Sequence, residues 1–185
     1  MTTETFMQFA HSNEGARMEM SGHGEIIAYS PTGGGSGASN SDLAIELGLW
    51  ARRDATGRTF DSSTLFVLPN GAKRSPDAAW VLLSRWNALS ATEKEKPVPF
   101  LPDFAVEILS PTDSLTETQD KMAEYMANGV RLGWLIDRLK HTVYIYRPNV
   151  ADPEVLTDPA TVSGDPELPG FVLDMSLIFP QRQTP

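Results

Sequence analysis

The sequence predicts one α/β domain in which a central mixed β-sheet is flanked by helices. Short apolar segments of strand length alternate with two longer segments whose apolar residues recur at helical spacing. The chain has 185 residues, of which 41% are hydrophobic, and this fits a single domain with a sizeable core. The predicted order is helix, strand, strand, strand, helix, strand, with a β-hairpin in front.

The N-terminal residues predict a short helix and a β-hairpin. Residues 4–10 fit one or two helical turns, and residues 17–20 and 25–29 fit two strands. Between these strands lies Ser-Gly-His-Gly, whose glycines supply the positive φ angles of a tight turn. Residues 31–37 are Pro-Thr-Gly-Gly-Gly-Ser-Gly and predict a loop. Because no Lys-Ser or Lys-Thr follows, the sequence argues against a phosphate-binding P-loop.

A first long helix is predicted after this loop. Leu43, Leu47 and Trp50 recur at helical spacing, and Gly57 marks the expected end. A serine or asparagine at the start of such a stripe is typical of an N-cap. The candidate caps are Ser39, Asn40 and Ser41.

The remaining predicted elements follow along the chain. They are a strand at 58–68, a turn at 69–71, a strand at 76–83, a surface excursion with one helical segment at 84–99, a strand at 103–110, a helix at 116–128, and strands at 132–137 and 142–146. We expect residues 1–148 to form the domain and residues 149–185, rich in proline and acids, to form an arm packed on it. No internal repeat is visible.

Composition excludes several classes of protein. Without cysteine, no disulfide or thiolate metal site can form, and three histidines far apart in sequence argue against a histidine-based metal site. No apolar run is long enough for a membrane span, and no leader peptide is recognisable, so we expect a cytoplasmic protein. The net charge of −9, from 15 basic and 24 acidic residues, argues against non-specific phosphate contacts over the whole surface.

Glu107 interrupts an apolar strand. Its neighbours on the same strand face are Ala105 and Leu109, whereas Val106 and Ile108 face the other side. A lone buried carboxylate costs several kcal/mol, so Glu107 must be protonated, paired with a basic residue, or bound to a cation. An ion pair with an arginine or lysine and a metal site are both open readings.

A second carboxylate, Asp77, follows Pro76 at the start of another apolar strand. A Pro-Asp pair usually marks only a turn, but proline is also tolerated at the first residue of a strand. If the two strands are neighbours, Asp77 and Glu107 lie side by side and repel unless a positive charge lies between them. Magnesium and manganese, which prefer oxygen ligands, would supply that charge.

Three further side chains are candidates for this site. Lys121 and Tyr125 lie one turn apart on the second predicted helix. Lys121 is either solvated or able to stabilise a developing negative charge. On the first helix, Asp42 and Glu46 share a face; they are either surface acids or one of them completes the metal site through water.

Taken in order, these motifs resemble the Uma family of restriction-endonuclease-like proteins, within the PD-(D/E)XK nuclease superfamily. The similarity covers about residues 15–148. The matching segments are Gly24-Glu25-Ile26, Ser30-Pro31, Asp61-Ser62-Ser63, Leu68-Pro69-Asn70-Gly71, Pro76-Asp77, Glu107-Ile108-Leu109-Ser110-Pro111, Lys121 with Tyr125, and Gly129-Val130 before Trp134-Leu135-Ile136-Asp137. The resemblance implies a restriction-endonuclease-like fold, with Asp77, Glu107 and the Ile108 carbonyl as metal ligands.

One position departs from the superfamily pattern. The lysine expected two residues after the acid is Leu109 here, and the family resemblance implies that Lys121 takes its role. If Lys121 cannot reach the site, catalysis is in doubt even where metal binding is not. Of the two acids on the first helix, Asp42 aligns better than Glu46.

The function predicted is a Mg²⁺- or Mn²⁺-dependent endonuclease acting on nucleic acid, DNA in preference to RNA, with a homodimer compatible with the need to address two strands. Basic side chains near the site are either a substrate face or scattered charges: Arg52, Arg53, Arg58, Lys73 and Arg74. The competing reading is a catalytically silent nuclease-fold protein that serves as a binding or dimerisation module. A carboxylate-pair glycosidase is disfavoured because Trp80, Trp86 and Trp134 lie in core-like patterns.

Overall fold

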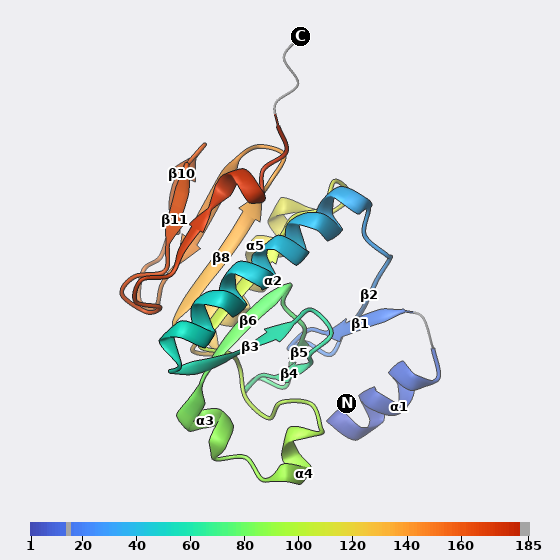
Figure 1. The fold of residues 1–185 in the computed structure, drawn as a ribbon. Helices are drawn as coiled ribbons and strands as arrows, with labels where there is room; N and C mark the ends of the chain where they lie inside the picture. Colours follow the sequence, from blue (N-terminus) through green and yellow to red (C-terminus); the bar gives the residue numbers. More distant parts are fainter. Residues whose placement is uncertain (14–15, 182–185) are drawn as a thin grey trace.

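A six-stranded mixed β-sheet forms the centre of the computed structural model, which describes residues 1–13 and 16–181 (Figure 1). The strand order is β10-β9-β8-β7-β6-β3. Its strands are β3 (Gly57–Asp61), β6 (Ala78–Leu82), β7 (Phe104–Ile108), β8 (Leu132–Asp137), β9 (Thr142–Tyr146) and β10 (Glu154–Thr157). Strands β7 and β8 are parallel and the other pairs are antiparallel, so the predicted mixed sheet is confirmed.

Helices cover both faces of this sheet. Helix α2 (Gly34–Asp54) packs on one face, where Leu43 and Leu47 share a core with Phe104 and Val106. Helix α5 (Leu115–Ala127) packs on the other face, in a core that contains Ala105 and Leu109 of the β7 segment. The alternation predicted for this strand is therefore confirmed, and it places the side chain of Glu107 on the α5 face.

A smaller sheet in the order β2-β1-β5-β4 lies beside the α5 face. It contains β1 (Arg17–Met20), β2 (Ile26–Tyr29), β4 (Phe66–Val67) and β5 (Lys73–Arg74), and it follows helix α1 (Thr3–His11). The predicted hairpin is confirmed, since β1 and β2 pair antiparallel. The single strand predicted for 58–68 is wrong: it divides into β3 and β4, which belong to different sheets.

The start of α2 also differs from the prediction. Residues 34–37 are helical rather than part of a loop, and the N-cap is Gly33, not Ser39, Asn40 or Ser41. Tertiary contacts outweigh the low helix propensity of the glycines. Ser39 donates a hydrogen bond to the Ile178 carbonyl at 2.9 Å, and Gly35 allows close approach of Arg138, whose Nη2 lies 3.1 Å from where a Cβ would be.

The excursion at 84–99 holds two short helices, α3 (Leu83–Asn87) and α4 (Ala91–Lys94), where one helical segment was predicted. Near the C-terminus, β10 extends the central sheet. Strands β11 (Thr161–Ser163) and β12 (Val172–Asp174), with the 3-10 helix η1 (Met175–Leu177), pack on the α2 face. These C-terminal strands were not predicted.

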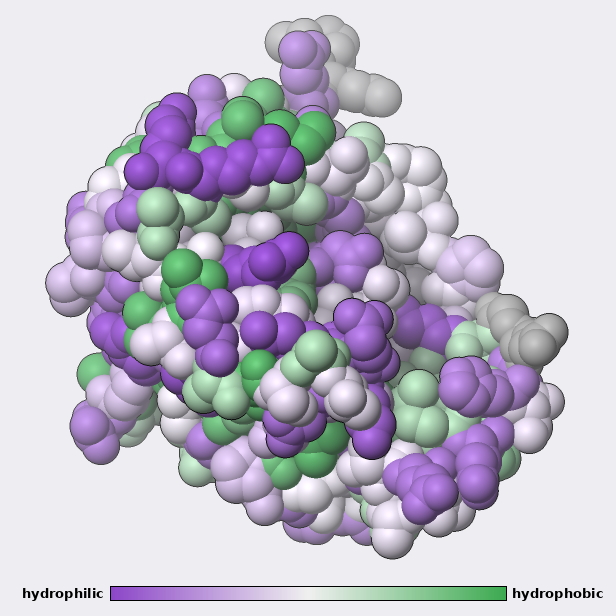
Figure 2. All heavy atoms as spheres, turned by 60° about the horizontal axis from the view of Figure 1, so that its bottom comes forward, coloured by the Kyte–Doolittle hydropathy of each residue, from purple (hydrophilic) through white to green (hydrophobic). Residues whose placement is uncertain are grey.

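Figure 2 shows the face of the molecule on the side of α3 and α4. On this face, small hydrophobic areas are separated by hydrophilic residues, and no continuous apolar area is formed. Among the described residues, no helix is both long and apolar enough to cross a membrane.

Candidate active site

Asp77 and Glu107 meet where the pairing of β6 with β7 ends. The last paired residues are Ala78 and Val106, and beyond them the Ile108 N–H donates a hydrogen bond to Asp77 Oδ2 at 2.8 Å. The Asp77 carboxylate thus accepts the hydrogen bond that a backbone carbonyl would accept if the pairing of β6 with β7 continued. Because the N–H and C=O of an extended residue point the same way, the Ile108 carbonyl also faces Asp77.

Glu107 is buried and bound by two side chains of α5. Lys121 Nζ lies 2.8 Å from Glu107 Oε1, and the Tyr125 hydroxyl donates a hydrogen bond to the same oxygen at 2.8 Å. Burial raises the pKa of Glu107 to about 7; Lys121 opposes this rise, and the negative charge of Asp77 adds to it. Of the two open readings, the ion pair is therefore present, and Lys121 reaches the acid from its helix.

Sequence reasoning missed a third carboxylate, Glu19 of β1, which is completely buried. Its Oε1 lies 2.9 Å from Lys121 Nζ, and its Oε2 lies 3.2 Å from Arg74 Nη1. Burial would raise the pKa of Glu19, but Lys121 and Arg74 lower it below its usual value. A glutamate between two methionines is a weak signal, and the contact depends on where the hairpin lies relative to α5.

Lys121 is consequently held between two carboxylates. Burial would lower the pKa of its ammonium group, but Glu107 and Glu19 together raise it, so Lys121 is cationic. The reading of Lys121 as a solvated surface lysine is wrong, since its side chain is 9% exposed.

Arg74 also belongs to this buried network. Besides Glu19, its guanidinium contacts Glu124, with Nε 2.6 Å from Oε2. Because both ion pairs are formed and the side chain is only 6% exposed, the Arg74 guanidinium is buried and paired rather than free at the surface. Arg17 differs, because its side chain is 36% exposed and its Nη1 lies 3.6 Å from Asp77 Oδ1.

These residues line one cavity of about 1450 Å³. Its lining carries eight carboxylates, whereas Arg17, Arg74 and Lys121 are its lysines and arginines. The carboxylates are Glu19, Glu25, Asp77, Glu107, Asp113, Glu117, Asp120 and Glu124. Such an excess of negative charge concentrates cations, and it opposes an anionic substrate that comes without them.

Other predicted residues are not brought to this cavity. Asp42 and Glu46 are partly buried but absent from its lining; Asn40 is the α2 residue that contacts Asp77, with Nδ2 3.3 Å from Oδ1. Two residues correspond to about 200° of helical rotation, which turns Asp42 away from Asn40. Arg52 and Arg53 are exposed in the last turn of α2, about 18 Å along the axis from Asn40.

The donor set around Asp77 fits a hard cation. Asp77, Glu107 and the Ile108 carbonyl offer oxygen ligands, and both contacts of Glu107 use Oε1, which leaves Oε2 as a candidate ligand. Asn40 Oδ1 is buried without a hydrogen-bond partner in the described part of the chain. Within residues 1–13 and 16–181, no group of three or more His, Asp or Glu side chains is arranged to hold a metal. The fit is therefore to Mg²⁺, which binds through one or two carboxylates and keeps several waters.

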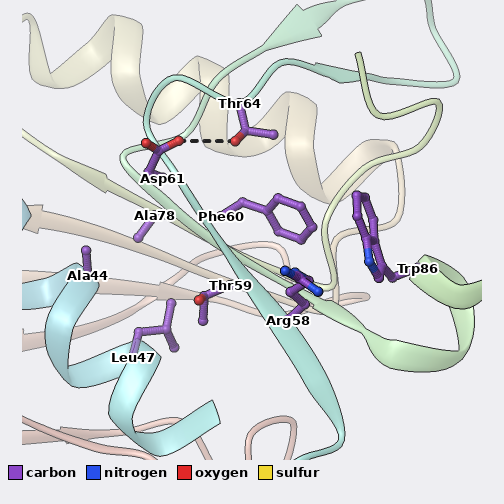
Figure 3. Close-up of a pocket in the computed structure, with 9 residues that line it drawn as sticks. All are labelled: Ala44, Leu47, Arg58, Thr59, Phe60, Asp61, Thr64, Ala78 and Trp86. Atoms are coloured by element: carbon purple, nitrogen blue, oxygen red, sulfur yellow. Dashed lines mark hydrogen bonds between the residues drawn. The ribbon is translucent and has the colours of Figure 1, made fainter. Parts of the chain in front are cut away.

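A second, smaller cavity of about 480 Å³ lies between α2, β3 and α3 (Figure 3). Asp61 and Thr64 lie at one end and Trp86 at the other, with Phe60 and Arg58 between them (Figure 3). Trp80 and Trp134 are buried in the core. Trp80 and Trp134 are thus unavailable to a ligand, so a sugar-binding cleft lined by Trp80, Trp86 and Trp134 is not formed.

The raised pKa of Glu107 predicts a pH-dependent contribution to stability in metal-free protein. Between the ordinary value of 4.5 and the folded value of about 7, the folded state keeps a proton that the unfolded state releases. This group therefore lowers the free energy of unfolding as pH rises through that window, by at most about 1.4 kcal/mol per pH unit. Between pH 5 and pH 8, the free energy of unfolding should therefore fall less in Glu107→Gln than in wild type. Urea unfolding in the presence of EDTA measures this difference.

A matched control for this experiment is Asp152→Asn, because Asp152 is an exposed acid outside the cavity. It should follow the wild-type pH dependence. If the free energy of unfolding changed with pH in the same way in wild type and in Glu107→Gln, the raised pKa of Glu107 would be contradicted.

Asp77 directly precedes β6, and Glu107 lies in the neighbouring strand β7 of the central mixed sheet, an arrangement that fits the class of restriction-endonuclease-like folds. The sequence model of the Uma2 family, described as "Putative restriction endonuclease", matches residues 3–176, and the chain belongs to this family. Both the predicted family and the predicted fold are confirmed. Membership supports a nuclease, that is, a hydrolase of phosphodiester bonds.

Among solved structures, the chain is similar to one described as a putative nuclease belonging to DUF820 from Anabaena variabilis ATCC 29413. The two superpose with a TM-score of 0.80 at 24% sequence identity, over 97% of this chain and 97% of the other. This likeness shows the fold. No curated protein matches the chain.

Proposed function

We propose that this protein is a metal-dependent endonuclease that hydrolyses phosphodiester bonds of nucleic acid, with DNA favoured over RNA. The observation that carries the proposal is the meeting of Asp77 and Glu107 at the end of the β6–β7 ladder, in one cavity with Lys121. Membership of the Uma2 family, described as "Putative restriction endonuclease", supports the reaction class.

In this proposal Asp77, Glu107 and the Ile108 carbonyl hold Mg²⁺ or Mn²⁺. When bound, the ion would activate water as the nucleophile and would neutralise charge on the scissile phosphate. The Ile108 N–H and the Asn40 amide each bind one oxygen of Asp77, and these two contacts fix the orientation of its carboxylate. The repulsion of Glu107 by Asp77 favours a cation beside them.

Lys121 would stabilise the negative charge that develops on the phosphate. Its ammonium group is kept cationic and fixed by Glu19 and Glu107, so it needs no rearrangement at the moment of reaction. Tyr125 is a positioning residue, because its hydroxyl orients Glu107. Asp42 and Glu46, on another side of α2, would act only through water.

The acidic cavity restricts how a phosphate can enter. Arg17 is the partly exposed arginine of the lining and the proposed first contact for the scissile phosphate. Arg52 and Arg53 would contact only nucleic acid that extends beyond the cavity, and the role proposed for Arg74 is structural.

A homodimer would let two sites act on two strands.

The test is a cleavage assay on supercoiled plasmid and on single- and double-stranded DNA and RNA oligonucleotides, with Mg²⁺, Mn²⁺ or EDTA. We expect cleavage with either metal and none with EDTA, and faster cleavage of DNA than of RNA. Cleavage that persists in EDTA would contradict the metal-dependent mechanism.

The second candidate is a silent nuclease-fold protein that only binds or dimerises. The observation in its favour is that Lys121 already neutralises Glu107 without a metal ion. Binding of an oligonucleotide without cleavage under every metal condition would support this candidate against the enzyme.

A further inference from the structure

The N-terminal turn of α2 is open to a ligand. This helix of 21 residues begins after Gly33, which supplies no side-chain cap, and its first turn contains no acidic residue. The first backbone N–H groups of a helix have no partner within the helix, and the helix dipole places partial positive charge there. Phosphate groups bind to such helix ends in many proteins.

Two buried side chains at this turn have unsatisfied polar atoms. Ser36 lies in the first turn and is 3% exposed, yet its hydroxyl has no hydrogen-bond partner within the described chain. Arg138 is 8% exposed, its Nε also lacks a partner, and its guanidinium lies against Gly35. No acidic side chain among the described residues forms an ion pair with Arg138, and a buried cation without a counter-charge is unfavourable. An anion at this turn would satisfy these groups.

The turn faces the cavity of the candidate active site. Gly33, Ser36 and Asn40 line the same cavity as Asp77. From Gly33 to Asn40 the helix advances about 10 Å, which equals the rise of about three nucleotides along the axis of a DNA duplex. A strand whose scissile phosphate lies at Asp77 can thus place another phosphate at the start of α2.

We propose that the N-terminal turn of α2, with Ser36 and Arg138, binds a non-scissile phosphate of the substrate strand. The inference rests on the proposed function. Backbone N–H groups, a hydroxyl and a guanidinium are all donors, as an oxyanion requires, and the guanidinium matches phosphate oxygens in pairs. This turn adds positive charge on the α2 side of a cavity whose charged lining residues are mostly acidic.

The experiment measures binding rather than cleavage, so that it does not depend on catalysis. A fluorescent single-stranded DNA oligonucleotide is titrated in EDTA with wild type, Ser36→Ala, Arg138→Gln and the double variant, at several salt concentrations. For the double variant we expect Kd to rise about tenfold and the slope of log K against log salt to fall by about one. Arg131→Gln, which removes an exposed charge, should match wild type.

Thermal unfolding separates this role from a structural one. Since Arg138 lacks a buried acid partner, Arg138→Gln should unfold at an equal or higher temperature than wild type in the absence of ligand. A large fall in the unfolding temperature would show that Arg138 stabilises the fold, and would overturn its assignment to phosphate. Ser36→Ala removes one unpaired hydroxyl, so it keeps the test valid if Arg138→Gln does not fold.

Inorganic phosphate identifies the source of the anion. We expect phosphate at millimolar concentration to compete with the oligonucleotide in wild type and not in the double variant. If phosphate binds to wild type but oligonucleotide affinity and salt slope are unchanged in the double variant, the site takes free phosphate and the proposal is overturned. Reduced oligonucleotide binding in the double variant, in a protein that never cleaves, would support this site while contradicting the proposed hydrolysis.

Discussion

Asp77→Ala is expected to lower the rate of phosphodiester cleavage at least about 10³-fold, because it removes a proposed metal ligand that no neighbouring carboxylate replaces. The Ile108 N–H also loses its partner, which should lower the free energy of unfolding by only about 1–3 kcal/mol. The loss of activity should therefore appear in protein that is still folded at 25 °C, as measured by single-turnover cleavage of plasmid and by circular dichroism.

Asp152→Ala is the matched control for this variant, since it removes one carboxylate from an exposed position outside the cavity. It should cleave at the wild-type rate. An Asp77→Ala protein that retains more than a tenth of wild-type activity would show that Asp77 is not a ligand needed for the reaction.

The second large effect is expected for Lys121→Met, which keeps the length of the side chain and removes its charge. Glu19 and Glu107 would then lie buried without the ammonium group that now contacts both, at 2.9 and 2.8 Å. Breaking a buried ion pair in this way costs about 3–5 kcal/mol of unfolding free energy, measured by urea unfolding at pH 8. Cleavage should also be lost.

Two comparisons make the Lys121 result specific. Lys121→Arg keeps the charge and should recover part of the stability. Lowering the pH from 8 to 5 should also recover part of it in Lys121→Met, since Glu107 can then be neutral. Equal unfolding free energies for Lys121→Met and wild type at pH 8 would contradict the buried network.

The strand of Glu107 shows how far sequence reasoning extends to the site. Alternation along residues 104–109 gave the correct face for each side chain, because that period is a local property of a strand. The resemblance carried by the Pro-Asp and Glu-Ile-Leu-Ser-Pro motifs implied that Asp77 and Glu107 lie close together, which the residues alone had left conditional. Lys121 was expected to approach from the following helix, and it contacts Glu107.

Residues whose role depends on packing between distant segments were not predicted. Glu19 contacts Arg74 and Lys121, which are 55 and 102 positions further along the chain. Helix α2 begins earlier than its glycines suggest, and Ser39 in its second turn donates a hydrogen bond to the carbonyl of Ile178, 139 positions further along the chain. Asn40, rather than Asp42, is the α2 residue that contacts Asp77.

Manganese binding measured by titration calorimetry tests the central claim most directly. We expect wild type to bind Mn²⁺, and both Asp77→Ala and Glu107→Gln to lose that binding while remaining folded. Asp152→Ala should bind as wild type does. Absence of Mn²⁺ binding to wild type, or unchanged binding in both variants, would contradict a metal site between Asp77 and Glu107; Glu107 would then be the partner of Lys121 alone.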